Sequence, residues 1–151
     1  MRSTRNRRPC FLVALALLTG CGFVSRDEVA RVTSPDGRVE AVLIETNGGA
    51  TTSFGYEVHV VEKGQPTRER VAFLYRAGRN ENAYGVNLKW VDDNQVAIEY
   101  WDARQQSLER ASVNVAGRII KVSLRSGIND PTAPAGGMLY NLERTRSGAS
   151  K

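Results

Sequence analysis

The chain has few of the side chains from which catalytic and metal sites are built. Its 151 residues include only two cysteines, Cys10 and Cys21, and one histidine, His59. Zinc and other transition-metal sites usually need three or four Cys or His ligands. A single histidine also leaves little material for Ser-His-Asp chemistry. We therefore expect no metal, no cofactor and no enzymatic activity.

Long hydrophobic runs are absent as well. The segment FLVALALL at 11–18 is only eight residues long, whereas a membrane-spanning helix needs about 20 apolar residues. Four arginines precede this segment, and the small residues Thr19 and Gly20 follow it. A basic start, a short apolar run and small residues are typical of a secretory leader. Residues 1–20 are therefore expected to be a signal peptide.

The end of this leader, Leu18-Thr19-Gly20-Cys21, resembles the signal of bacterial lipoproteins. The resemblance implies that the sulfur of Cys21 takes a diacylglycerol and that Cys21 becomes the first residue of the mature chain. Two or more acyl chains make membrane attachment stable. Residue 22 is Gly rather than the Asp that retains enteric lipoproteins at the inner membrane. We expect a lipid-anchored protein of the bacterial cell envelope, at the periplasmic face of the outer membrane.

Removal of the leader changes the cysteine count and the charge of the chain. With Cys21 lipidated, no thiol remains for a disulfide, so the stability of the domain must come from its core. Four of the 21 basic residues and none of the 16 acidic residues precede Cys21, which leaves a formal charge of +1. This balance, without a basic run, argues against nucleic acid as a partner.

Helical periodicity is missing from the rest of the chain, where apolar and polar residues alternate between turn signals. One helical turn at 105–110 is the most helix that the pattern allows. Alternation of this kind predicts β-strands. The expected strands are residues 29–33, 38–46, 54–63, 70–76, 86–90, 96–100, 111–115 and 118–125, and residues 138–142 could add one last short strand.

These short strands predict an all-β fold, an antiparallel β-sandwich or a barrel-like meander of about seven or eight strands with little helix. Residues 21–28 are expected to form a lipidated tether, 29–142 the β domain and 143–151 a flexible tail. In the strand at 54–63, the face that carries Tyr56 and Val58 is expected to be buried. Glu57 and His59 point the other way and are expected on the polar surface.

The segment Asn47–Ser53 (NGGATTS) is the most distinctive loop of the domain. Gly48 and Gly49 would allow backbone amides to approach a ligand, and Thr51 and Thr52 offer hydroxyls. The same glycines would also serve a wide connection between two strands, and this structural interpretation is the simpler one. Together with Asn47, these residues are nevertheless the first candidate contacts for a ligand or partner.

Trp101 is the second candidate contact. If Tyr100 joins the core, Trp101 lies on the outer face, where it and Tyr84 could hold a sugar ring or a partner protein. A second strand of the sandwich could equally cover it. The segment Asp92-Asp93-Asn94 lacks the spacing of a calcium loop and is expected to be a hairpin turn.

Residues 34–61, SPDGRVEAVLIETNGGATTSFGYEVHVV, resemble small bacterial envelope lipoproteins of unknown function, which share the Ser-Pro-Asp-Gly turn and the Gly-Ala-Thr-Thr segment. The resemblance implies an envelope location and a small β domain, and it transfers no catalytic residue. Our leading hypothesis is a non-catalytic lipoprotein whose β domain binds an envelope protein or a cell-wall component. The alternative is a small-ligand module that uses the 47–53 loop. A hydrolase that uses Glu57, His59 or an Asp pair is the third hypothesis.

Overall fold

The computed structural model describes residues 24–67 and 69–134. In this part the chain forms nine β-strands and no helix, so the prediction of an all-β fold is confirmed, with one or two strands more than expected. The strands are β1 (Ser25–Thr33), β2 (Val39–Asn47), β3 (Phe54–Glu62), β4 (Arg70–Gly78), β5 (Asn87–Asp92), β6 (Gln95–Glu99), β7 (Asp102–Leu108), β8 (Ser112–Val115) and β9 (Arg118–Arg125). Over these residues, no helix is long and apolar enough to cross a membrane.

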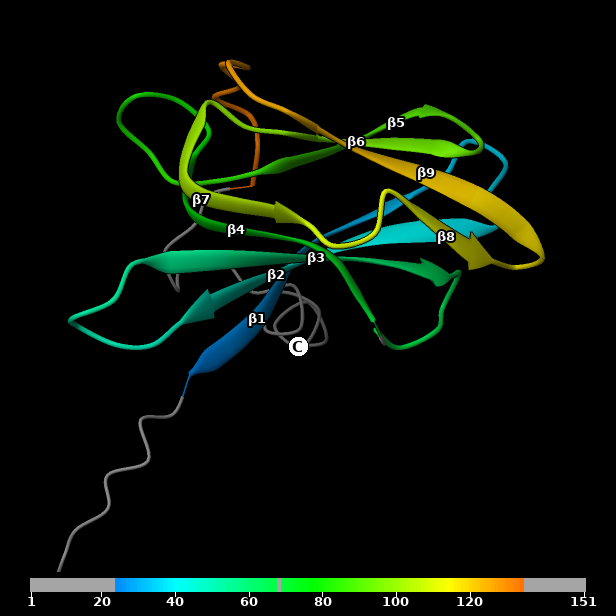
Figure 1. Cartoon of the computed structure of the whole chain (residues 1–151), viewed down its shortest axis with the longest axis horizontal. Helices are drawn as coiled ribbons and strands as arrows, with labels where there is room; N and C mark the ends of the chain where they lie inside the picture. Colours follow the sequence, from blue (N-terminus) through cyan, green and yellow to red (C-terminus); the bar gives the residue numbers. More distant parts are fainter. Residues whose placement is uncertain (1–23, 68, 135–151) are drawn as a thin grey trace, which may run out of the picture.

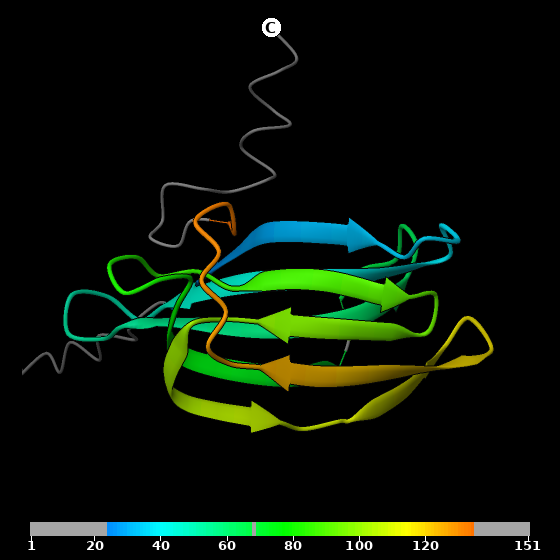
Figure 2. The ribbon, with the colours of Figure 1, turned by 90° about the horizontal axis from the view of Figure 1, so that it is seen from above.

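The strands form two sheets that pack face to face (Figure 1). The five-stranded sheet has the order β1-β2-β3-β4-β7, and the four-stranded sheet has the order β5-β6-β9-β8. Seen from above, the strands of the two layers run nearly alongside each other (Figure 2). This is the aligned packing of a β-sandwich, in which the twist of each sheet leaves only a small angle between the layers.

One pair of neighbouring strands is parallel, and the sequence analysis did not anticipate it. β6 and β9 pair in parallel from Gln95 with Lys121 to Glu99 with Arg125, while all other pairs are antiparallel. Parallel neighbours need a long crossover connection. Here the chain leaves β6, adds β7 to the edge of the other sheet, and returns through β8 before it forms β9.

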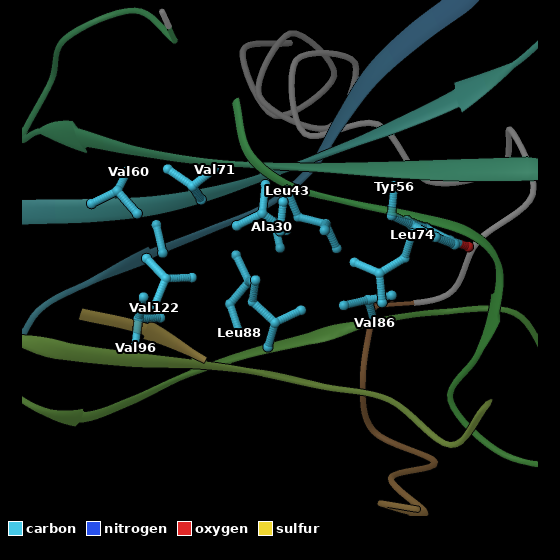
Figure 3. Close-up of a cluster of buried hydrophobic side chains, with 14 of the residues drawn as sticks. Ala30, Leu43, Tyr56, Val60, Val71, Leu74, Val86, Leu88, Val96 and Val122 are labelled. Atoms are coloured by element: carbon cyan, nitrogen blue, oxygen red, sulfur yellow. The ribbon is translucent and has the colours of Figure 1, made fainter. Parts of the chain in front are cut away.

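The core lies between the two sheets and is built from the inward face of each alternating strand (Figure 3). Leu43, Leu74 and Val86 are fully buried there, and each such side chain contributes about 1.5–3 kcal/mol by leaving water. Tyr56 is equally buried, and its hydroxyl donates to the Glu45 carboxylate at 3.0 Å. Burial, followed by the charge of Glu45, raises the pKa of Tyr56, which keeps its proton on this hydrogen bond.

The strand registers place the connections at two opposite ends of the sandwich. β1 begins at one end, which we call the proximal end, where Ser25 pairs with Asn47. The connection after β2, the end of β4 and the start of β7 lie there too, because Asn47 pairs with Phe54 and Gly78 with Asp102. The two wide connections at this end, 47–53 and 79–86, both lie at the left of Figures 1 and 2.

Short turns close the opposite, distal end and tie the two sheets together. In the Ser34-Pro35-Asp36-Gly37 turn, the Ser34 hydroxyl donates to Asp36 at 2.7 Å, and Gly37 has a φ of 77°. Arg118, at the start of β9, donates to both carboxylate oxygens of Asp36, at 2.5 and 3.0 Å. The Asp36 amide donates to the Asp93 carboxylate at 2.9 Å, in the β5–β6 turn. The Asp36 turn therefore joins the five-stranded sheet to two hairpins of the other sheet.

Two predicted elements differ from the structure. The pattern allowed at most one helical turn at 105–110, and none forms, because residues 102–108 form β7 and pair with β4 from Gly78 to Ala72. β1 starts at Ser25, so residues 25–28 belong to the sheet rather than to the tether. The strand expected at 138–142 lies outside the described residues.

We expect the Asp36→Asn variant to have a lower thermal unfolding midpoint than the wild type at neutral pH. The difference between the two midpoints should become smaller in acid. The hydrogen bonds from Arg118, then that from Ser34, lower the pKa of Asp36 from 3.8 to about 2. A carboxyl whose pKa is lower in the folded than in the unfolded state stabilises the fold above its ordinary pKa. This stabilisation disappears as the pH falls through the folded-state value. Circular dichroism melts from pH 7 to pH 2 should therefore show the two midpoints converging.

Glu62→Gln, at an exposed position of the same end, is the matched control for this experiment. Its midpoint should follow that of the wild type over the whole pH range. A constant gap between Asp36→Asn and the wild type at every pH would contradict a role for the charge of Asp36.

Candidate functional site

A shallow pocket of about 410 Å³ opens at the proximal end, between the connection that follows β4 and the first residues after β6. It combines two aromatic rings with amide, carboxylate and guanidinium groups. Pockets of this kind, with apolar surface and a few convergent polar groups, are the usual form of a binding site. The lining residues are Arg76, Gly78, Asn80, Glu81, Asn82, Ala83, Tyr84, Trp101 and Asp102.

The outer wall is the loop at 79–83, and its own hydrogen bonds hold it. The Arg79 amide donates to the Ala83 carbonyl at 2.9 Å, and the Asn82 amide donates to the Asn80 side chain at 2.9 Å. The second contact is an Asx turn, which explains the asparagine at this position. A Cβ added to Gly78 would lie 2.9 Å from the Asn80 carbonyl oxygen, so the loop closes only over a glycine.

The loop is also fixed from behind by the segment that follows β9. The Arg79 guanidinium donates to the Ala133 carbonyl at 2.7 Å, and the Asp130 amide donates to the Arg79 carbonyl at 2.9 Å. Gly85 lies against the same segment, because a Cβ there would come within 2.6 Å of the Pro134 carbonyl oxygen. The wall of the pocket is therefore held on both sides without any ligand.

Trp101 forms the facing wall, directly after β6. Its amide donates to the Gly78 carbonyl at 2.7 Å, and its carbonyl accepts from the Gly127 amide at 2.9 Å. The side chain is half-buried and has no hydrogen bond or ring contact with another described residue. Trp101 therefore shares the pocket lining with Tyr84 and stands at a corner between the sheets, neither on the outer face of β6 nor fully covered by another strand.

Tyr84 links this pocket to the 47–53 loop. Its ring packs edge-on against Phe54, with the centroids 5.5 Å apart and the planes at 63°. The Ser53 side chain and then the Arg76 guanidinium lower the pKa of the Tyr84 phenol by hydrogen bonding. Ser53 is the last residue of the glycine-rich loop, and Phe54 follows it directly. That loop therefore supports Tyr84 from behind while remaining outside the pocket.

The glycine-rich loop forms several hydrogen bonds among its own residues. The Gly49 amide donates to the Asn47 side chain at 2.8 Å, and the Thr52 hydroxyl donates to the Gly49 carbonyl at 3.1 Å. Gly49 has a φ of 100°, and the Thr52 side chain lies against Gly48. None of these residues, nor the exposed Thr51, lines the proximal pocket. The structure thus favours the structural interpretation of this loop.

Arg76 is a site residue that the sequence analysis missed. It has a φ of 54°, although it lies inside β4 and carries a full side chain. Among the described residues, Ala116 is the other non-glycine with a positive φ, and it belongs to the two-residue turn Ala116-Gly117, whose type requires it. No turn requires it at Arg76. A strained residue that lines a pocket is an indication of function.

The environment of His59 differs from the expected polar surface. His59 and Glu57 point away from the core as predicted, but only 3% and 7% of their surfaces are exposed. Arg26 forms a two-pronged ion pair with Glu57, and the Arg70 guanidinium lies 3.6 Å from the same carboxylate. Burial, partly offset by Glu57 at 3.4 Å, lowers the pKa of His59. Arg26 comes from β1, two strands away in the sheet, and Arg70 comes from the neighbouring strand β4, which alternation within β3 could not indicate.

The other acidic clusters have structural roles in the described part of the chain. Asp92 accepts the Asn94 amide at 2.7 Å, and Asp93 accepts the Asp36 amide, as expected for a hairpin turn. Over the described ranges, no three His, Cys, Asp or Glu side chains gather where they could hold a metal ion.

A second hollow, of about 570 Å³, lies toward the distal end between β3, β4 and β8. Its floor is aliphatic, from Val60, Val71, Val113 and Val115. The described residues of its lining include no aromatic ring and no basic side chain. The proximal pocket offers the more varied recognition chemistry.

Comparison with protein families, with curated proteins and with solved structures finds no match to this chain.

We expect Arg76→Gly to be more stable than Arg76→Ala by about 1 kcal/mol, because both lose the guanidinium while only alanine keeps the strained backbone. Chemical denaturation of the two variants measures this difference. Ala116→Gly is the control and should gain a similar amount over the wild type, since it removes the same strain in a turn. Equal stability of the two Arg76 variants would show that the positive φ carries no strain.

Proposed function

We propose that the protein is a lipid-anchored, non-catalytic component of the bacterial envelope whose β domain binds another envelope component at its proximal end. The sequence Leu18-Thr19-Gly20-Cys21 supports the anchor, and the pocket beside Tyr84 and Trp101 supports the binding role. The observation that carries the proposal is the position at which β1 begins.

β1 begins four residues after Cys21, at the proximal end. Four residues span at most about 14 Å of fully extended chain. A lipid on Cys21 would therefore keep the proximal end within that distance of the membrane surface. The 47–53 loop and the proximal pocket would face whatever lies at that surface, and the distal turns would point away from it.

The chemistry of the proximal end supports binding rather than catalysis. The single histidine, His59, is buried beside Glu57 and Arg26 in the five-stranded sheet and does not line the pocket. The side chains of Tyr84 and Trp101 are rigid, largely apolar surfaces with polar edges, which is the composition of binding hot spots. The absence of Asp after Cys21 supports the outer membrane, at its periplasmic face, as the location.

A small-ligand module is the second candidate function, and the preformed proximal pocket favours it. A thermal-shift screen with variants of each site shows whether a ligand binds at the 47–53 loop or in the proximal pocket. If the 47–53 loop binds the ligand, the double variant Gly49→Val, Thr51→Val abolishes the shift. If the pocket binds it, Trp101→Ala does so instead.

We expect Cys21→Ser to abolish lipid attachment, because the hydroxyl of serine does not replace the thiol in this modification. Cells that express the wild type should incorporate labelled palmitate into the protein, and cells that express the variant should not. Cys10→Ser is the matched control and should be labelled normally. Label on the Cys21→Ser protein would refute the proposed anchor.

Site-directed photo-crosslinking in intact cells tests the binding role. We expect a photoreactive residue at Thr51 or Asn82, both exposed at the proximal end, to capture a reproducible partner. The same residue at Ile119, which is 64% exposed toward the distal end, is the control and should capture none. Capture from Ile119 alone would reverse the proposed orientation, and no capture at any position would contradict a stable envelope partner.

A further inference from the structure

The proximal pocket combines two kinds of surface that a sugar requires. The faces of a pyranose ring carry C–H groups that pack against aromatic rings, and its rim carries hydroxyls that donate and accept hydrogen bonds. Tyr84 and Trp101 supply aromatic surface to the pocket. Asn80, Asn82 and Asp102 supply amide and carboxylate groups that match hydroxyls in both directions.

The charge of the pocket lining selects among hydroxyl-rich ligands. Among the described residues of the lining, Arg76 is the one cation, whereas Glu81 and Asp102 are carboxylates. The nearby guanidinium of Arg79 is directed to the Ala133 carbonyl instead. A phosphate or another multiply charged anion would meet an excess of negative charge here. An uncharged sugar can instead accept hydrogen bonds from Arg76 and donate them to the carboxylates.

Contacts within the protein hold the walls of the pocket in place, which reduces the entropy cost of binding. Backbone hydrogen bonds hold the Trp101 wall to Gly78, and the Arg79 amide closes the opposite loop on Ala83. Phe54 supports the ring of Tyr84. The strained backbone of Arg76 places its guanidinium against the Tyr84 phenol, at the edge of the aromatic surface.

We propose that the proximal pocket binds a glycan through one uncharged pyranose ring held between Tyr84 and Trp101. The proposal rests on the proposed function and specifies its partner chemistry. Two sources near a membrane surface offer such a ring, the glycan strands of the cell wall and the headgroups of glycolipids. The shared chemistry is a pyranose with free hydroxyls.

The test uses the full-length lipidated protein in nanodiscs, and calorimetry measures the binding. One arm titrates a soluble cell-wall disaccharide of N-acetylglucosamine and N-acetylmuramic acid into nanodiscs of plain phospholipid. The other arm presents the protein to vesicles that contain an uncharged glycolipid, a monoglucosyl diacylglycerol, with plain phospholipid vesicles as the reference. Binding in the first arm identifies the cell wall as the source, and binding in the second identifies a glycolipid.

We expect Trp101→Ala and Tyr84→Ala each to weaken binding at least tenfold, because each removes an aromatic surface from the ring. Trp101→Phe should restore part of the loss, which a merely misfolded variant would not do. Asn82→Ala changes an exposed loop residue and should weaken binding severalfold without an effect on the melting temperature. Ile119→Ala, at the distal end, should bind as the wild type does.

No binding of sugar in either arm would overturn the glycan proposal. It would leave the envelope-binding function standing if Thr51 or Asn82 still captures a protein partner in cells. Sugar binding that is unchanged in folded Trp101→Ala and Asn82→Ala proteins would also overturn the proposal, because the glycan would then occupy another surface.

Discussion

The corner at Tyr100 and Trp101, where the chain crosses from one sheet to the other, is the constraint on which much of the structure depends. Tyr100 is buried in the core, and its amide donates to the Arg125 carbonyl at 3.1 Å. The next amide, that of Trp101, donates to the Gly78 carbonyl at the end of β4. β7 begins directly afterwards and completes the edge of the five-stranded sheet. The chain must therefore return to the four-stranded sheet before it can form β9. There, β9 runs parallel to β6. The same corner places Trp101 outside the core, opposite the loop that carries Tyr84.

Alternation of apolar and polar residues was sufficient to predict most strands, because a strand that packs on one face has a period of two. The hairpin at 86–100 shows this clearly, with Leu88 and Ile98 paired across it and facing the core. β7 does not show this alternation, because it lies at the edge of a sheet, where residues such as Arg104 and Gln105 are exposed. β7 forms because it pairs with β4, which lies elsewhere in the chain, so the sequence of β7 alone does not indicate a strand. Alternation also placed His59 on the correct face, but it could not show that arginines from β1 and β4 cover that face.

The candidate site was predictable only in part, because sequence shows residue types and not the geometry that unites them. Aromatic character pointed to Trp101 and Tyr84, and the structure brings both into one pocket. The glycines of the 47–53 loop drew attention as a ligand cradle, but the Gly49 amide and the Thr52 hydroxyl form hydrogen bonds within the loop. Arg76 gave no signal, since a positive φ at a charged residue arises from the surroundings of the backbone and not from its own propensity.

The two ends of the sandwich differ in how their connections are held. At the distal end, Asp36 joins both sheets through Arg118 and Asp93, so the turns there contribute to stability. At the proximal end, the backbone hydrogen bond between Arg79 and Ala83 closes the loop at 79–83, while Glu81 and Asn82 in that loop stay exposed. Under the proposed lipidation of Cys21, the short tether before β1 would keep this end near the bilayer. The proposed anchor would then select partners by their position as well as by the chemistry of the pocket.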